Sequence, residues 1–458
     1  MITYQDLEEH KTSDEELMDY VFAIVQAHKR SDEYETAVLA DEYARQKNRT
    51  ITEYRKLLYT ISGEAVPDNF SANYKLCSNF FFKLVTQENQ HLLGNGITWG
   101  KDDTADKLGK DFDIRVQDAG FEALVAGRAF GFWNYDHLEV FNLREFAPLY
   151  DEENGALMAG VRFWQLDRSK PLRATLYEVD GYTEYIWMRR EDGEKNGAVL
   201  HPKRAYKLKT RTSPADGVEI YDGENYEGFP IVPLYGDQYR QSAIVGLQSE
   251  IDAYDLIRSG FANDLDDASQ IYWTIQNAGG MDDVDLVQFI QHMKTVKAAV
   301  VDDDGARAEA HTIDLPYSAR ETLLTRLRAD IYEDFMALDT REIAGGAITA
   351  TQIEAEYDPL NLKVDMYEYQ VIEFLQGILK LAGIEDDPTF TRSQIVNRAE
   401  TLGVLIQAAQ YLPRDYVVEK LLTLLGDADR VEDVLKQIEA DELAMAQMQA
   451  AQADGGEE

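Results

Sequence analysis

The run Gly228-Phe229-Pro230-Ile231-Val232-Pro233-Leu234-Tyr235, followed by Leu247-Gln248-Ser249-Glu250-Ile251-Asp252-Ala253-Tyr254-Asp255, marks a change from one kind of structure to another. In the first run, prolines flank apolar residues, which is typical of a strand that closes a β region. In the second run, apolar residues recur every three or four positions as far as Leu265, which predicts a long helix over about 243–269. A helix with so narrow an apolar seam needs neighbours to pack against.

Upstream of this junction the chain reads as helices and then strands. Apolar spacing predicts helices over about 14–29, 32–44, 68–93 and 111–128, with Ser13 and Ser31 at helix N-termini. From about 129 to 235, short aromatic and β-branched runs alternate with turn signals, namely Glu153-Asn154-Gly155, Asp180-Gly181 and Asp192-Gly193. This pattern predicts a mainly antiparallel β domain. The aromatic residues of 130–187 fit the core of its sheets, and a sugar-binding groove is the alternative.

Downstream of the junction, two long helices enclose a small insert. The insert, 271–316, is predicted to contain a strand at 271–275, a short helix near 283–293 and a strand near 298–301. The second long helix is predicted over about 318–338, and a third over about 351–381. The tail at 393–445 reads as three helices with breaks at Leu412-Pro413 and Gly426-Asp427, and residues 446–458 are expected to fray. The predicted fold class is α+β.

The charge of the chain limits the ways in which it can handle nucleic acid. Lys and Arg total 45 and Asp and Glu total 84, which gives a formal net charge of −39. A protein that grips duplex DNA collects phosphates on a basic face, and this chain is not basic on average. Two interpretations remain: a highly soluble acidic protein, or a protein whose acidic wall repels phosphates and lets DNA slide past.

The composition of the chain also indicates the cellular compartment in which we expect the protein. The sequence has no apolar run long enough for an ordinary membrane helix. Residues 1–9 are acidic and polar, unlike a secretory signal, so we expect a cytoplasm-like compartment. Cys77 is the single cysteine, which excludes an intrachain disulfide and fits a buried small apolar residue.

The sequence carries few signs of catalytic chemistry. None of the seven histidines lies three to five residues from another or from Cys77, and no Walker A loop or nucleophile elbow is present. Asp302-Asp303-Asp304 could hold a cation or form a solvated turn. The glycine-bearing break at 340–350 could be a simple interhelix loop or a mobile loop beside a passing ligand. We therefore expect no catalytic residues, no metal, no cofactor and no enzymatic activity.

The order of these pieces resembles the portal proteins of tailed double-stranded-DNA bacteriophages of the siphophage type. Four features carry the resemblance, which spans roughly residues 55–440. The most specific is the run 228–235 followed by 247–255, Ser259 and Asn263-Asp264. The others are an Asn-containing helix at 73–80 that ends on Leu92-Leu93-Gly94, the run Gly127-Arg128-Ala129-Phe130-Gly131, and the order of insert, helix, Gly-Gly loop and long helix.

The resemblance implies a portal fold with named parts. Residues 1–238 would form the wing, with 351–391 returning to it as a long helix. Residues 239–270 and 317–339 would be the two stem helices, and 271–316 the small α/β clip between them. Residues 340–350 would be the tunnel loop, 392–445 the helical crown and 446–458 a flexible tail.

The same resemblance implies roles for individual residues. The tunnel loop would face DNA with Arg341, Glu342, Ile343, Ala344, Gly345, Gly346, Ala347 and Ile348. Stem helices of neighbouring subunits would pack through Leu247, Ile251, Tyr254, Phe261, Leu324, Leu327, Ile331 and Phe335. The clip would contact the terminase or adaptor proteins through Trp273, Asp282, Asp283, Asp302, Asp303 and Asp304.

Family portals form rings, usually of about twelve subunits. The implied partners are other copies of this chain, the major capsid protein and scaffold, the large terminase ATPase, head-tail adaptor proteins and the double-stranded DNA in the channel, with no membrane. The implied location is the portal vertex of the virion, after assembly in the host cytoplasm. The alternatives are another ring-forming head-tail or tail structural protein, and an acidic hydrolase that acts through carboxylates.

Overall fold

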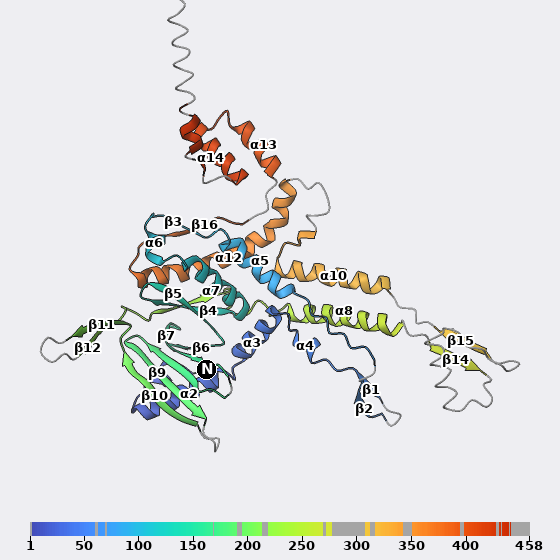
Figure 1. Cartoon of the computed structure of the whole chain (residues 1–458), viewed down its shortest axis with the longest axis horizontal. Coiled ribbons are helices and arrows are strands. Elements are labelled where there is room, and N and C mark those ends of the chain that lie inside the picture. Colours follow the sequence, from blue (N-terminus) through green and yellow to red (C-terminus); the bar gives the residue numbers. More distant parts are fainter. Residues whose placement is uncertain are drawn as a thin grey trace, which may run out of the picture. The chain divides into compact units, whose positions relative to one another are not determined.

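The computed structural model describes residues 2–59, 63–68, 71–167, 169–189, 195–212, 219–268, 272–276, 307–311, 317–341, 350–393, 398–426, 430–431, 433–438 and 440. They fall into two compact units. The first comprises Met1–Ala337 and Lys363–Arg392, and the second comprises Leu338–Leu362 and Ser393–Glu458. The chain combines helices with sheets whose strand pairs are all antiparallel in the described residues, which confirms the predicted α+β class (Figure 1).

The helices and strands have the following bounds. The helices are α1 (Tyr4–Glu9), α2 (Asp14–His28), α3 (Asp32–Ala44), α4 (Arg49–Thr52), α5 (Phe80–Leu93), α6 (Thr104–Leu108), α7 (Phe112–Ala126), α8 (Gln248–Ala268), α10 (Tyr317–Phe335), α12 (Ala350–Ala382), α13 (Arg398–Ala408) and α14 (Arg414–Leu425). The strands are β1 (Leu57–Tyr59), β2 (Ala65–Pro67), β3 (Ile97–Trp99), β4 (Arg128–Asn134), β5 (His137–Asn142), β6 (Phe146–Tyr150), β7 (Leu157–Trp164), β8 (Leu172–Glu178), β9 (Gly181–Arg189), β10 (Lys195–Arg204), β11 (Lys207–Thr212), β12 (Glu219–Glu224), β13 (Ile231–Tyr235), β14 (Tyr272–Gln276), β15 (Arg307–His311) and β16 (Pro388–Phe390).

The β part of the first unit contains a five-stranded sheet in the order β10-β9-β8-β7-β6 and a three-stranded sheet in the order β13-β4-β5. Side chains alternate between the faces of a strand, and β8 illustrates this. Leu176 packs with α1 and α2 in one apolar cluster, whereas its neighbour Tyr177 packs with Phe130 and Phe141 of the three-stranded sheet in another. Most of the aromatic residues between 130 and 187 are therefore sheet core, as predicted.

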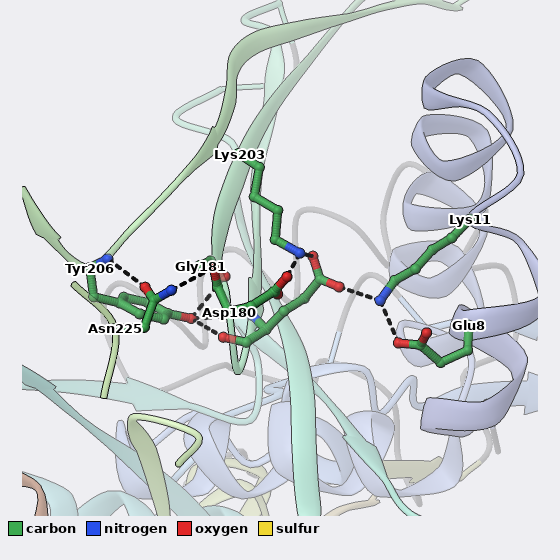
Figure 2. A network of polar contacts seen from close by, with 8 residues as sticks. Glu8, Lys11, Asp180, Gly181, Lys203, Tyr206 and Asn225 are labelled. Carbon is green, nitrogen blue, oxygen red and sulfur yellow. Dashed lines mark hydrogen bonds and ion pairs between the residues drawn. The ribbon is translucent and has the colours of Figure 1, made fainter. Parts of the chain in front are cut away.

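A polar network fastens the N-terminal helix to the five-stranded sheet (Figure 2). The buried carboxylate of Glu178 lies 2.5 Å from Nζ of Lys11 and 3.1 Å from Nζ of Lys203. The hydroxyl of Tyr206 donates to the carbonyl of Glu178 at 2.5 Å, and Asn225 donates to the carbonyl of Asp180 at 2.8 Å. Two lysines thus compensate one buried carboxylate, which makes its burial tolerable.

Helices α5, α7 and α12 meet at a point where only glycine fits. A Cβ on Gly120 of α7 would lie 2.2 Å from the hydroxyl of Tyr367 and 2.4 Å from Oδ1 of Asn89. That hydroxyl donates to the same Asn89 oxygen at 3.1 Å. Helix α7 ends at Gly127, whose φ of 85° is left-handed and favours glycine. The chain therefore turns directly from α7 into β4.

Several predicted helices match the structure closely because local signals define them. Helices α2 and α3 begin after Ser13 and Ser31, whose side chains accept from the backbone N–H groups of Glu16 and Tyr34. The predicted helix over 351–381 is α12, and the two long helices around the insert are α8 and α10. Helices α13 and α14 of the second unit match two of the three predicted tail helices, and the third is described only in part.

Two predictions need correction. The helix predicted over 68–93 begins only at Phe80, because residues 72–79 form no regular secondary structure and the backbone N–H groups of Tyr74, Leu76 and Ser78 bond to side chains of α8. In the insert, β14 pairs with β15 at 307–311, a strand that the apolar pattern did not indicate. The predicted helix near 283–293, the strand near 298–301, the Asp192-Gly193 turn and the tail at 446–458 lie outside the described residues.

Candidate functional site

Helices α8 and α10 form an antiparallel pair on either side of the insert in sequence, and they lie side by side in Figure 1. At one end, Arg320 of α10 forms an ion pair with Asp264 of α8. Close by, the rings of Phe261 and Tyr317 meet edge to face with centroids 5.6 Å apart. At the other end, Glu250 of α8 lies beside Asp334 of α10. Contacts at both ends fix the register of the two helices.

The apolar seam predicted on these helices divides into two groups. Leu247, Ile251, Ile331 and Phe335 are buried within this chain, where they join α8 and α10 to the rest of the first unit. The other four side chains are half-buried, and they are Tyr254, Phe261, Leu324 and Leu327. Of the eight predicted residues, the second group keeps surface that a neighbouring molecule could cover, and the subunit contact itself remains a prediction.

Three polar side chains of α8 hold the extended segment before α5. Oδ1 of Asp255, Oγ of Ser259 and Oδ1 of Asn263 are spaced four residues apart and so lie on one face of the helix. They accept hydrogen bonds from the backbone N–H groups of Ser78, Leu76 and Tyr74 at 2.8, 3.0 and 2.6 Å. Every second backbone amide of the segment thus bonds to every fourth residue of the helix. We call this arrangement the α8 ladder.

The α8 ladder continues to the N-terminal helices. Oδ2 of Asp255 accepts from Nδ2 of Asn48 at 3.0 Å, and Oδ1 of Asn48 accepts from the hydroxyl of Tyr43 at 3.0 Å. Burial raises the pKa of Asp255, and the hydrogen bonds from Asn48 and Ser78 oppose this by stabilising the carboxylate. One fully buried carboxylate therefore holds the chain on both sides of 49–77.

A carboxyl pair lies at the end of α8 nearest the β domain. Burial raises the pKa of Glu250 to about 7, and its hydrogen bond with Asp334 and the charges of Asp334 and Asp330 add to the rise. A hydrogen bond between two carboxyl groups requires that one of them carry a proton. The α8–α10 contact therefore changes its charge near neutral pH.

A buried ion pair joins α5 to α12. Nζ of Lys363 lies 3.0 Å from Oε2 of Glu88 and donates to the carbonyl of Phe335, the last residue of α10, at 3.1 Å. Burial raises the pKa of Glu88 and lowers that of Lys363, while their mutual attraction opposes both changes. Beside the pair lies a cavity of about 370 Å³, which is also lined by Asp237 and Asp334.

Few of the other predicted site residues fall in the described part of the chain. Arg341 is described and exposed, whereas 342–348 lie outside the described residues. Trp273 lies in β14, and Asp282, Asp283, Asp302, Asp303 and Asp304 lie outside. The roles predicted for these residues remain predictions.

Sequence reasoning did not assign the residues that hold α8 in place. Asp255, Ser259 and Asn263 carried the family resemblance, yet their role as backbone acceptors was not predicted. A signal was present, because small polar residues at positions i, i+4 and i+8 of an apolar-seamed helix are typical of a second buried face. Among the described residues, no group of three His, Cys, Asp or Glu side chains is arranged to hold a metal ion, and no helix is long and apolar enough to span a membrane.

Known proteins with similar sequences point to one family. A family model described as phage portal protein, SPP1 Gp6-like, matches residues 40–447. A curated relative named portal protein, from Clostridium phage phiCD119, is 22% identical over 382 residues, with 76% of this chain and 81% of the relative covered.

Solved structures of gene transfer agent particles are also similar to this chain. The neck of an empty particle gives a TM-score of 0.42 at 12% identity and covers 76% of this chain and 90% of that one. The neck of a native particle gives 0.42 at 13% identity, with 75% and 89% covered.

The family model covers the N-terminal helices from residue 40 onward, the β domain, the α8–α10 pair and α12–α14 in a single match. That span includes the α8 ladder and the residues that carried the resemblance in the sequence. The chain belongs to the SPP1 Gp6-like family of phage portal proteins.

Proposed function

We propose that this chain assembles into a ring of about twelve copies at one vertex of a phage capsid, through which double-stranded DNA enters and leaves. The observation that carries the proposal is the portal family match over residues 40–447. Portal proteins are structural proteins of the virion, and the proposed role needs no catalytic group. The ring would be built in the host cytoplasm and would remain at the head vertex.

The proposed parts of the ring subunit follow the element order. Helices α8 and α10, within 239–270 and 317–339, would form the stem, and β14 with β15, within 271–316, the clip. Residues 1–238 and 351–391 would form the wing, 340–350 the tunnel loop and 392–445 the crown. The antiparallel α8–α10 pair supports the stem assignment, because two long helices of fixed register suit side-by-side packing around a ring.

The half-buried stem residues would make the contacts between subunits. Tyr254, Phe261, Leu324 and Leu327 retain part of their surface after α8 and α10 have paired. Exposed Leu256, Leu265 and Leu323 on the same helices add apolar surface. Apolar side chains on a soluble helix pair are typical of an interface that another chain covers.

The net negative charge of the chain fits a channel that lets DNA pass better than a protein that binds DNA tightly. At a formal net charge of −39, twelve copies would surround DNA with acidic surface that offers few sites for phosphates. The tunnel loop, Arg341 to Ile348, would face the DNA. Force for packaging would come from the large terminase ATPase, which we place with adaptor proteins at clip residues Trp273, Asp282, Asp283, Asp302, Asp303 and Asp304. Capsid protein and scaffold would contact the wing.

Negative-stain electron microscopy with mass photometry tests the proposal. We expect hollow rings of about twelve subunits from the purified chain, or from the chain produced together with scaffold and capsid protein. A particle that stays monomeric under both conditions would contradict the ring. A fibre or a ring without a channel would favour another structural role in the head or tail.

A further inference from the structure

The end of α10 has an unfavourable backbone conformation. Helix α10 ends at Phe335, and the next residue, Met336, has a φ of 62°. Its backbone N–H donates to the carbonyl of Glu333 at 3.0 Å, and that of Ala337 donates to the carbonyl of Tyr332 at 2.9 Å. Glycine is the usual residue at this point of a helix end, because a side chain disfavours the left-handed region. Contacts with other elements must therefore hold the last turn of α10 in place.

Lys363 of α12 supplies such a contact. Its ammonium donates to the carbonyl of Phe335 at 3.1 Å and lies 3.0 Å from the centre of the Phe335 ring. The same ammonium forms the ion pair with Glu88 of α5, at 3.0 Å. Glu88 is 1% exposed and Phe335 is 3% exposed, so both partners are shielded from water. One buried cation thus joins the end of α10 to α5 and α12.

The position of Lys363 in the chain gives this contact its consequence. The first compact unit ends at Ala337 and resumes at Lys363. The chain between Phe335 and Lys363, which includes the predicted tunnel loop at 340–350, therefore begins and ends at one hydrogen bond. Breaking that bond would free the last turn of α10, whereas α12 would stay anchored by its own buried side chains.

A second acceptor for the Lys363 ammonium lies in the same cavity. Asp237, in the connection between β13 and α8, lines this cavity of about 370 Å³ together with Lys363 and Glu88. Burial lowers the pKa of Lys363, and the charges of Glu88 and Asp237 oppose this. The third carboxyl group of the cavity, Asp334, belongs to α10 itself and is hydrogen-bonded to Glu250. Because a lysine side chain is long and flexible, its ammonium can cross from Glu88 to Asp237 within the cavity. Glu88 would then bind a proton, because burial raises its pKa.

We propose that Lys363 is a latch with two positions, a closed position on Glu88 and the Phe335 carbonyl and an open position on Asp237, and that the open position releases the last turn of α10. The proposal goes beyond the ring proposed above and does not depend on it, since every group involved lies in one copy of the chain. A buried ion pair is weak evidence for stability, because apolar side chains of similar volume often stabilise a fold equally well. The experiment must therefore separate release of α10 from loss of stability.

Hydrogen–deuterium exchange with mass spectrometry on the purified full-length chain tests the latch. The measured quantity is the exchange rate of the last turn of α10, 332–337, divided by that of a peptide from α7. Glu88→Leu with Lys363→Met replaces the pair by apolar side chains and should keep the free energy of unfolding at or above that of the wild type. We expect this double variant to raise the rate ratio by about tenfold or more. Lys380→Met, at an exposed lysine of the same helix, is the control and should leave the ratio unchanged.

Two milder variants test the two positions separately. Glu88→Gln keeps an acceptor for the ammonium but removes the charge of the closed position, and it should raise the ratio by about threefold or more. Asp237→Asn removes the charge of the open position but keeps an acceptor for the backbone N–H of Gln241, and it should lower the ratio by about twofold or more. An ion pair with a purely structural role predicts no fall in the ratio for either variant.

Each outcome decides for or against the latch. If the double variant keeps both the unfolding free energy and the rate ratio of the wild type, Lys363 is a structural residue and the proposal is wrong. If Asp237→Asn leaves the ratio unchanged or raises it, the open position does not exist and the two-position latch is excluded. If the double variant does not fold, Glu88→Gln and Asp237→Asn decide, because only changes of opposite sign support the latch. A chain that forms no ring would contradict the proposed function and leave these measurements valid.

Discussion

Ser78 and Asp255 lie 177 positions apart in the sequence, and the backbone N–H of Ser78 donates to Oδ1 of Asp255 at 2.8 Å. The second oxygen of the same carboxylate accepts from Asn48. Three segments of the portal subunit therefore depend on one buried side chain, namely the N-terminal helices, the segment 74–78 before α5, and α8.

Replacing Asp255 by alanine should destabilise the chain markedly. The change leaves the Asn48 amide and the Ser78 N–H as buried donors without an acceptor, which costs about 1–3 kcal/mol for each group. We expect the free energy of unfolding in urea to fall by about 2–4 kcal/mol. Asp118→Ala, at a side chain 57% exposed, is the control and should change it by less than about 0.5 kcal/mol. An equal loss of unfolding free energy in the two variants would show that the α8 ladder does not stabilise the fold.

Stability should depend on pH through Glu250. Its pKa is raised from 4.5 to about 7 in the folded chain, so the folded state binds more protons than the unfolded state between these values. The contribution is therefore fully present below pH 4.5 and is lost as the pH rises through 7. Glu250→Gln, which keeps the hydrogen bond without a charge, should raise the melting temperature at pH 8 more than at pH 5. An equal rise in melting temperature at pH 5 and pH 8 would show that the titration of Glu250 does not affect stability.

Gly120→Ala should be among the costliest small substitutions. The added methyl group would overlap the Tyr367 hydroxyl and the Asn89 amide oxygen, which already bond to each other. Such overpacking costs about 1–3 kcal/mol. Gly403→Ala in α13, where nothing lies within 4 Å of the new Cβ, should be neutral or stabilising by up to about 1 kcal/mol. Chemical denaturation compares the two variants.

Assembly should fail when the half-buried stem residues become charged. Leu324→Asp combined with Leu327→Asp places two carboxylates in the proposed subunit contact, where each lost aliphatic side chain contributes about 1.5–3 kcal/mol. We expect folded monomers in mass photometry. Thr325→Asp, at an exposed position between them, is the control and should still form rings. Rings from the double variant would mean that this face meets solvent.

Removing the glycine-bearing loop should separate assembly from packaging. Deletion of Ile343 to Ile348 should leave rings intact, because the proposed stem contacts lie elsewhere, and should lower the amount of DNA packaged per head. The check is quantitative PCR of nuclease-protected DNA from heads that carry the variant. A normal amount of packaged DNA would show that the loop has no role in packaging. Loss of the rings would show that the loop is needed for assembly.

The sequence predicted the elements whose signals are local. The signals for α2, α3 and α12 lie in or next to these helices in the sequence: the N-caps Ser13 and Ser31, and the apolar spacing of α12. The extended segment before α5 was predicted as helix, because its competing acceptors lie on α8 at Asp255, Ser259 and Asn263. Helical periodicity within 68–93 cannot report an acceptor about 180 positions away.

The candidate site was predictable in outline and not in its contacts. Apolar spacing identified Ile251 and Ile331 on the paired helices, but spacing alone does not distinguish a side chain buried in its own chain from one that meets a neighbour. Likewise, no local pattern pairs Glu88 with Lys363, since the two lie on helices that only the folded chain brings together.

The α8 ladder also sets its own length. Four residues of helix advance about 6.0 Å along the axis, whereas two residues of strand advance about 6.6 Å. The two spacings therefore differ by about 0.6 Å for each successive hydrogen bond of the ladder. Three rungs stay within bonding distance, and a fourth toward α5 would meet Ile251, which has no acceptor. The series of backbone bonds therefore ends at Ser78, and α5 begins two residues later at Phe80.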